Sequence, residues 1–174
     1  MRRMSLTARL AQDAQNTSEI YAVLFYIEHS SLDKPILLST DPTERLQDDP
    51  LMYCTRSTWM DVNPVTDPYL FVLASATVPS DIDDVATDTS LVLENVDNDI
   101  AKLLRSFTDF ATVNIACVLA SSPDLIEAEW HGLKLMSAQI NAGEVALTIS
   151  RESIEDEKVP SGLMTKNRFP GVHR

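Results

Sequence analysis

Few side chains in this sequence have the types and the spacing that catalysis or metal binding requires. The three histidines, His29, His131 and His173, form no pair at the spacing of metal ligands. The chain has two cysteines, Cys54 and Cys117, whereas a zinc or iron–sulfur site made only of cysteine needs four. A nucleophile pair of either cysteine with His131 is an alternative that no local pattern supports.

The short motifs that hold phosphates or nucleophiles are also missing from the sequence. The patterns HExxH, GxSxG, GxGxxG and the P-loop do not occur, and the chain has only four glycines from which to build a phosphate-binding loop. We therefore expect no enzyme activity, no cofactor and no resident metal.

One acidic loop needs separate consideration, because carboxylate oxygens are the ligands that Ca²⁺ prefers. Its aspartates are Asp81, Asp83, Asp84 and Asp88. Their spacing is not that of an EF-hand, since the glycine of the sharp turn and the closing glutamate are both missing. We expect a solvated loop here, with cation binding as the alternative.

The charge of the chain is strongly negative and unevenly placed. Its 174 residues include 14 Lys and Arg against 26 Asp and Glu, which gives a net charge of −12. This balance argues against a general nucleic-acid binder and against docking on anionic lipid. No Lys or Arg lies between Arg56 and Lys102, whereas both ends of the chain are basic. The basic ends of one copy could therefore pair with the acidic middle of another. The simpler interpretation is that the acidic middle forms a solvated surface.

The pattern of apolar residues predicts one domain that is mainly β with short helices. A helix is expected over 5–15, capped by Ser5, with Leu6, Leu10 and Ala14 on one face. A second helix is expected over 96–107. Strands are expected over 19–29, 36–40, 52–59, 69–78, 90–96, 111–121, 125–142 (as one strand or two) and 144–153.

This set of elements indicates an antiparallel β-sandwich or barrel over residues 1–159, with an N-terminal helix and an extended C-terminal arm over 160–174. Four prolines within 41–68 break any long element there and leave that region hard to assign. The first residues lack the apolar stretch of a signal peptide, and the apolar runs are too short to span a membrane. We expect the protein to be made in a cytoplasm and to bind no membrane.

The C-terminal arm mixes basic and apolar residues. It is too short, and too often broken by proline and glycine, to fold alone. We expect it to dock on its own domain or on a neighbouring subunit, because its apolar side chains are otherwise exposed; a frayed tail is the alternative. The predicted interface residues are Leu163, Met164, Arg168, Phe169 and Pro170.

Four segments in this order resemble the DUF1833 family of tailed-bacteriophage proteins. A short helix leads into an apolar strand that ends near a histidine, over 8–42. A strand then runs into the helix start Asn-Val-Asp at 95–97, and a strand ending in Val-Leu-Ala-Ser precedes Pro-Asp at 123–124, with one serine more than the family pattern. The chain closes with Phe-Pro-Gly at 169–171. The resemblance covers nearly the whole chain except about 43–68.

The resemblance implies a structural virion protein of a long, non-contractile tail, assembled in the host cytoplasm. We expect a homo-oligomeric ring at the distal tail, hexameric rather than trimeric, in contact with the tail tube, the hub and the tape measure. A trimeric hub adaptor and an assembly chaperone that is absent from the virion are the alternatives. The family brings no catalytic residues. Asp81, Asp83, Asp84 and Asp88 then become candidates for a channel wall that repels DNA, so that the genome passes without binding.

Overall fold

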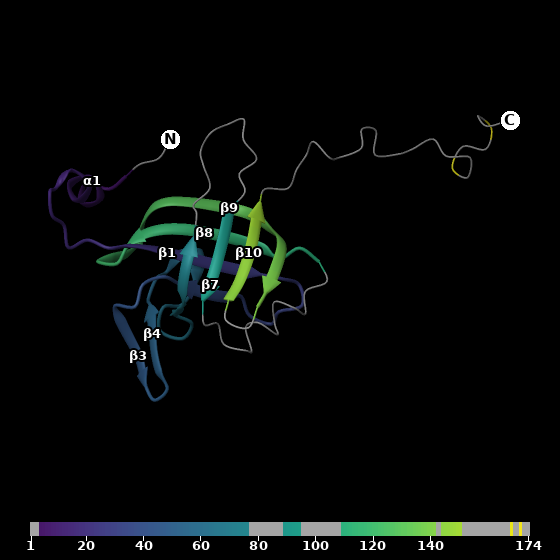
Figure 1. The fold of residues 1–174 in the computed structure, drawn as a ribbon, viewed down its shortest axis with the longest axis horizontal. Coiled ribbons are helices and arrows are strands. Elements are labelled where there is room, and N and C mark those ends of the chain that lie inside the picture. The colour runs from purple at the N-terminus through teal and green to yellow at the C-terminus, as the bar shows by residue number, and fades with distance from the viewer. Residues whose placement is uncertain are drawn as a thin grey trace.

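The fold is taken from a computed structural model, which describes residues 4–76, 89–94, 109–141, 144–150, 168 and 171 (Figure 1). This part of the chain is mainly β, as the sequence predicts. It contains the helix α1 (Leu6–Asp13), the short 3₁₀ turn η1 (Trp59–Asp61) and ten strands. The predicted helix over 96–107 and the arm over 160–174, except for 168 and 171, lie outside the described residues.

The strands come in chain order as β1 (Tyr21–Glu28), β2 (Ile36–Ser39), β3 (Glu44–Asp48), β4 (Leu51–Thr55), β5 (Tyr69–Phe71), β6 (Leu73–Ala76), β7 (Thr89–Glu94), β8 (Thr112–Leu119), β9 (Ser122–Ile140) and β10 (Glu144–Ser150). They form one sheet in the order β3-β4-β5-β2-β1-β8-β9-β10-β7-β6. The pairing is antiparallel, as predicted, except that β2 and β5 pair in parallel. The chain leaves β2, makes the β3–β4 hairpin and returns in the direction of β2.

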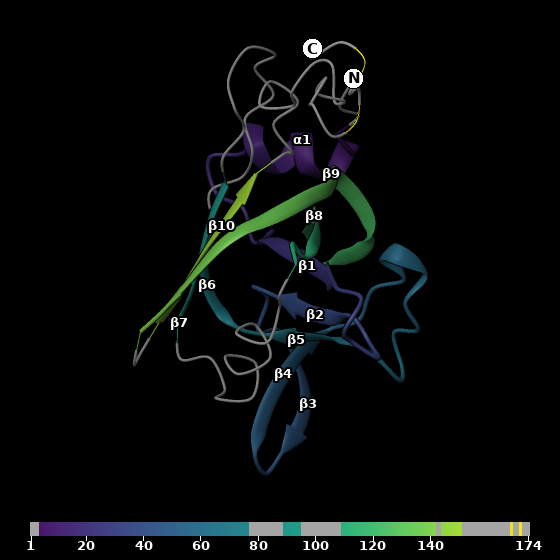
Figure 2. The same cartoon turned by 90° about the vertical axis from the view of Figure 1, so that its right-hand side faces the viewer.

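The strand β9 makes this single sheet resemble a sandwich. The sequence left open whether 125–142 holds one strand or two, and the structure has one strand of 19 residues. Its first part pairs with β8 and its last part with β10, with several register shifts along the β8 side. Such β-bulges bend a strand and increase its twist. The sheet therefore curls around β9 and brings its two halves over each other (Figure 2).

The main core fills the space between the two halves of the curled sheet. It draws apolar side chains from β1, β2, β8 and β9 on one side and from β7 and β10 on the other. Strands that bury one face need apolar residues at every second position, and β10 shows this alternation clearly. The buried members are Phe25, Ile27, Leu38, Leu91, Leu93, Ala111, Val113, Ile115, Trp130, Leu133, Leu135, Val145, Leu147 and Ile149.

A second, smaller core lies on the other face of β1, which explains why this strand is apolar almost throughout. Ala22 and Leu24 point to this side, where they meet Trp59 and Tyr69. The segment 56–68 covers them. The predicted strand over 52–59 is therefore right only as far as Thr55, because the chain then turns to insert Trp59 into this core.

The predicted strand over 69–78 also differs from the structure. It is divided into β5 and β6, which pair with different neighbours, and the backbone N–H of Val72 between them donates to the carbonyl of Ser39. Val72 and Ala74 are partly buried and pack against the main core. Among the described residues, no helix has the length and apolar character needed to cross a membrane.

Candidate interaction surface

Most of the residues that the sequence singles out for function lie outside the described part of the chain. This holds for the four aspartates of the acidic loop, and for Leu163, Met164, Phe169 and Pro170 of the arm. Arg168 is described, and its side chain is exposed. A role for the acidic loop at a channel wall and a role for the arm at an interface therefore stay predictions.

The described residues form no group of three or more His, Cys, Asp or Glu that could hold a metal ion. Neither Cys54 nor Cys117 is in a disulfide. Cys54 is buried, and burial raises the pKa of its thiol, which is the opposite of what a thiolate nucleophile needs. His29 Nδ1 lies 2.6 Å from Ser31 Oγ, but the N–H of Ser31 also donates to this nitrogen, as in a local turn. Both contacts of this nitrogen therefore come from a residue two positions further along the chain.

A shallow hollow of about 430 Å³ lies where β1 ends and β8 begins. Two carboxylates and the exposed ring of Phe110 give it an acidic and partly aromatic lining. Its lining residues are Glu28, His29, Ser30, Asp109, Phe110 and Thr112. An acidic pair in an open hollow does not identify a ligand, and we assign none.

The segment 56–68 is fixed to the body by polar contacts at both ends. At its start, Asp124 Oδ1 accepts hydrogen bonds from the backbone N–H (2.7 Å) and the hydroxyl (2.9 Å) of Thr58. These donors lower the pKa of the Asp124 carboxyl. The hydroxyl of Ser57 donates to the carbonyl of Pro123 at 2.8 Å. The first residues of the strand β9, which follow the turn at 120–121, thus hold the segment that covers the second core.

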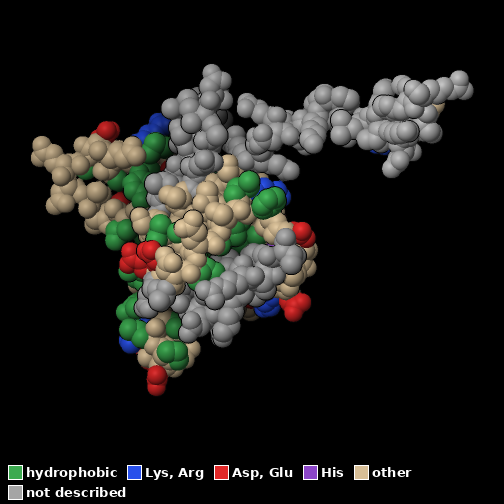
Figure 3. Space-filling model, turned by 45° about the vertical axis from the view of Figure 1, so that its right-hand side comes forward, with side chains coloured by type: hydrophobic (Ala, Val, Ile, Leu, Met, Phe, Trp, Pro, Cys, Tyr) green, Lys and Arg blue, Asp and Glu red, His purple; other side chains and the backbone are tan. Residues whose placement is uncertain are grey.

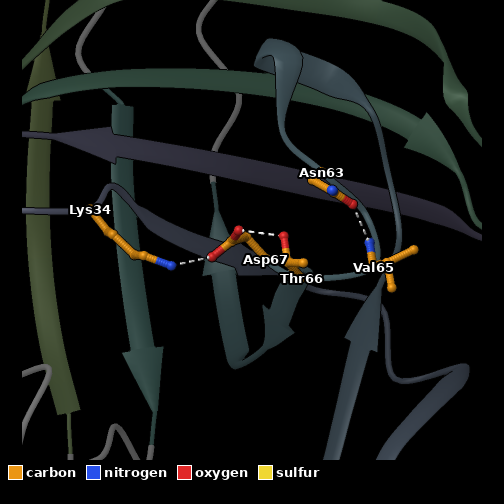
Figure 4. Close-up of polar contacts among 5 residues, drawn as sticks. All are labelled: Lys34, Asn63, Val65, Thr66 and Asp67. Atoms are coloured by element: carbon orange, nitrogen blue, oxygen red, sulfur yellow. Dashed lines mark hydrogen bonds and ion pairs between the residues drawn. The ribbon is translucent and has the colours of Figure 1, made fainter.

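The far end of this segment is a tight turn (Figure 4). The Asn63 side chain accepts a hydrogen bond from the N–H of Val65 at 3.0 Å, and the Thr66 hydroxyl donates to Asp67 at 2.7 Å. Lys34 reaches across from the loop before β2 and pairs with Asp67 at 2.8 Å. This ion pair is exposed, so it fixes the position of the turn more than it stabilises the fold.

Inside the segment, Trp59 is the central contact. Its ring packs edge-on to Tyr26 and lies tilted against Tyr69 and His131. The hydroxyl of Tyr69 donates to the carbonyl of Trp59 at 2.9 Å. Met60 and Asp61 have positive φ angles, which few residues other than glycine adopt, so the packing of Trp59 holds a strained turn.

The helix α1 is the second candidate interaction element, and it is attached to the sheet at both ends. At its start, the backbone N–H of Ser5 donates to Glu127 Oε2 at 2.7 Å, and Ser5 caps the helix through the N–H of Ala8. At its end, the Gln12 side chain contacts the Tyr21 hydroxyl at 3.3 Å. Helix formation and the Ser5 cap are as predicted.

The apolar face that the sequence predicts for this helix points outward. Ala8 is fully buried, whereas Leu6 is 72% exposed and Leu10 is 62% exposed. Elsewhere, hydrophobic side chains are interspersed with acidic and other polar ones on the visible surface (Figure 3). Two adjacent, strongly exposed leucines on one short helix are therefore a feature that needs an explanation.

The sheet edges are the remaining surfaces. Within the described part of the chain, β3 and β6 are the outer strands. The edge strand β3 carries charged side chains, and Arg45 pairs with Asp48 at 2.7 Å, as is usual for strands that must not aggregate. The β3–β4 hairpin extends away from the body (Figure 2).

Sequence reasoning missed Glu127 and the Ser57–Thr58 contact with Asp124. The second could not be found from local sequence, because Pro123 and Asp124 at the start of β9 lie 66 positions from their partners. A comparison of the sequence with models of known protein families finds no match, and one with curated proteins finds none either. The resemblance to the phage family therefore stays a prediction.

Proposed function

We propose that the protein is a structural component of a long, non-contractile phage tail, where it forms part of the distal ring that joins the tail tube to the hub. The observation that carries this proposal is the order and spacing of the four sequence motifs, which span nearly the whole chain.

The positions of the motifs in the fold support the proposal. The strand β1 follows α1 and ends directly before His29. The strand β7 ends at Glu94, directly before the Asn-Val-Asp motif, and β8 ends within the Val-Leu-Ala-Ser motif. Turns at the ends of strands and helices need particular residue types. Motifs at these positions are therefore expected to recur among proteins that share a fold.

The proposal is tested on particles of the phage whose genome encodes the chain. Mass spectrometry of purified virions measures whether the protein is present and in how many copies, and cryo-electron microscopy of the tail end locates it. A nonsense mutation in the gene is expected to give particles with incomplete tails. The matched control is the same phage complemented with the wild-type gene.

Each outcome separates the alternatives. Six copies in a ring at the distal tail support the proposal, and three copies at the tip favour the hub adaptor. Incomplete tails together with absence from finished virions favour the assembly chaperone. Normal tails and normal infectivity without the protein would overturn the distal ring, the hub adaptor and the assembly chaperone alike.

A further inference from the structure

The helix α1 has an exposed apolar face that points away from the sheet. The helix has eight residues, too few for a stable isolated helix, so its position depends on the contacts of Ser5 and Gln12. With about 100° between successive residues, Leu6 and Leu10 lie about 160° to 200° around the helix from the buried Ala8. Asp13 flanks them about 60° away from Leu10, and the exposed Arg9 lies about 60° from Leu6 on the same side, so the two flanking charges balance. We call Leu6, Leu10 and Asp13 the α1 face.

We propose that the α1 face binds residues 160–174 of a second copy of this chain. The net charge of this segment is opposite to that of the rest of the chain, and its apolar residues suit the leucines. Its three cations, Lys166, Arg168 and Arg174, are accompanied by no acidic residue, whereas the other 159 residues carry 11 Lys and Arg against 26 Asp and Glu. Its apolar residues Leu163, Met164 and Phe169 match the exposed leucines.

We take the binding partner to be a second copy because the described residues of both surfaces are exposed in the single chain. Leu6 and Leu10 are exposed in the single chain, and so is Arg168. The last strand among the described residues, β10, ends at Ser150, and 24 residues of the sequence follow it. At about 3.3 Å per residue, such a segment can reach up to roughly 80 Å, far enough for a neighbouring copy.

An arm that binds the helix of the next copy makes a head-to-tail contact, which closes into a ring if the rotation between copies allows it. The inference rests on the proposed function only in that both require the copies to associate. It holds for an assembly of any copy number and inside or outside a virion.

The test uses the full-length protein and sedimentation velocity over a range of concentrations. The variant Leu6→Gln/Leu10→Gln removes the apolar contact while keeping good helix formers. Val65→Gln is the matched control, because Val65 is also 72% exposed but lies in the segment 56–68. We expect the double variant and a deletion of 160–174 each to weaken self-association at least tenfold, and Val65→Gln to leave it unchanged.

Combining the double variant with the deletion is expected to weaken association no further, because both remove the same contact. Added peptide 160–174 is expected to dissociate wild-type assemblies, and more weakly so at high salt. Circular dichroism shows whether each variant keeps the β fold. A wild-type protein that stays monomeric, or variants that fold and associate normally, would overturn the inference.

A crosslinking measurement distinguishes a second copy from the chain's own arm. Leu10 is replaced by the photo-crosslinker p-benzoylphenylalanine, and the protein is mixed with isotope-labelled wild-type copies. Crosslinks from position 10 to the segment 160–174 of labelled copies are expected. Crosslinks only within one chain would overturn the inference, and absence of the protein from virions would overturn the proposed function alone.

Discussion

The backbone N–H of Ser5 donates a 2.7 Å hydrogen bond to Glu127 Oε2 and thereby joins the start of α1 to the middle of the sheet. Glu127 is the extra residue of a bulge, since Ile126 pairs with Val118 and Ala128 pairs with Cys117. Bulges redirect side chains, and this one places a carboxylate that is only 6% exposed at a helix N-terminus, where the dipole favours a negative charge. Glu127 thus keeps the two outward leucines of α1 in place.

We expect the variant Glu127→Ala to loosen α1 while leaving the sheet intact. It removes a hydrogen bond to a charged acceptor, which is worth about 1–2 kcal/mol, and the helix has few other attachments. The exchange of backbone amide hydrogens in residues 8–13 is then expected to quicken by about 5- to 30-fold. Hydrogen-exchange mass spectrometry measures this directly.

Glu129→Ala is the control for this variant, since Glu129 lies two residues away on the same strand and has an exposed side chain that faces His131 at 3.0 Å. It is expected to leave exchange in α1 unchanged. Equal protection of α1 in Glu127→Ala and in the wild type would show that the helix is held by other contacts.

The difference between β1 and Glu127 shows what the sequence can and cannot predict. The apolar run of β1 identifies a buried strand, because the signal is local and repeated over eight residues. The burial of Glu127 depends on a register shift between β8 and β9, and register is decided by pairing between distant segments. The local sequence therefore does not predict that the side chain of Glu127 is buried.

The segment 41–68 cannot be assigned fully from its sequence for a related reason. Its prolines indicate only where regular structure ends, whereas its fold is decided by Trp59, which enters a core made by β1, β5 and β8. The outward face of α1 was also not predictable, since periodicity identifies an apolar face but not whether the same chain covers it.

The hydroxyl of Tyr69 is expected to contribute measurably to stability. Tyr69 is fully buried, and its hydroxyl donates to the carbonyl of Trp59. The variant Tyr69→Phe removes this donor and leaves the carbonyl without it. We expect a loss of about 1–3 kcal/mol in the free energy of unfolding, measured by urea denaturation. Tyr53→Phe is the control, because Tyr53 is only half-buried, and its loss is expected to be smaller.

The same tyrosine predicts alkaline instability. Burial raises the pKa of Tyr69 above its ordinary value of 10.0, so the folded protein keeps the proton longer than the unfolded chain does. Its contribution to stability is therefore complete below about pH 10 and is lost as the pH rises further. Tyr69→Phe is expected to show a shallower decline above pH 10, with the remainder coming from Tyr26, Cys54 and Lys34, whose pKa values are also raised. Parallel declines in both proteins would contradict this.

Gly132 is expected to be sensitive to substitution for reasons of backbone conformation alone. Its φ is +68°, and a Cβ added there would meet no atom within 4 Å. Its N–H donates to the Asn114 side chain at 2.9 Å, within the bulge that bends β9. Gly132→Ala is expected to cost about 1–2 kcal/mol, and Gly132→Asn less, because asparagine tolerates this region better. Equal stability of the three proteins in urea would show that the bulge relaxes.

The contact between Asp124 and Thr58 predicts an acid-sensitive attachment of the segment 56–68. The two donors of Thr58 lower the pKa of Asp124 below its ordinary value of 3.8. The stabilisation of the folded protein by this contact is therefore complete above about pH 3.8. It is lost as the pH falls through the lowered pKa. Asp124→Asn is expected to destabilise the protein at pH 7 by less than about 1 kcal/mol, because the exposed carboxylate is screened by water. The difference from the wild type, measured by urea denaturation, should shrink toward pH 3, whereas the exposed control Asp33→Asn should differ little at either pH. A difference that is independent of pH would mean that the amide disturbs the turn itself and that the charge of Asp124 does not hold the segment.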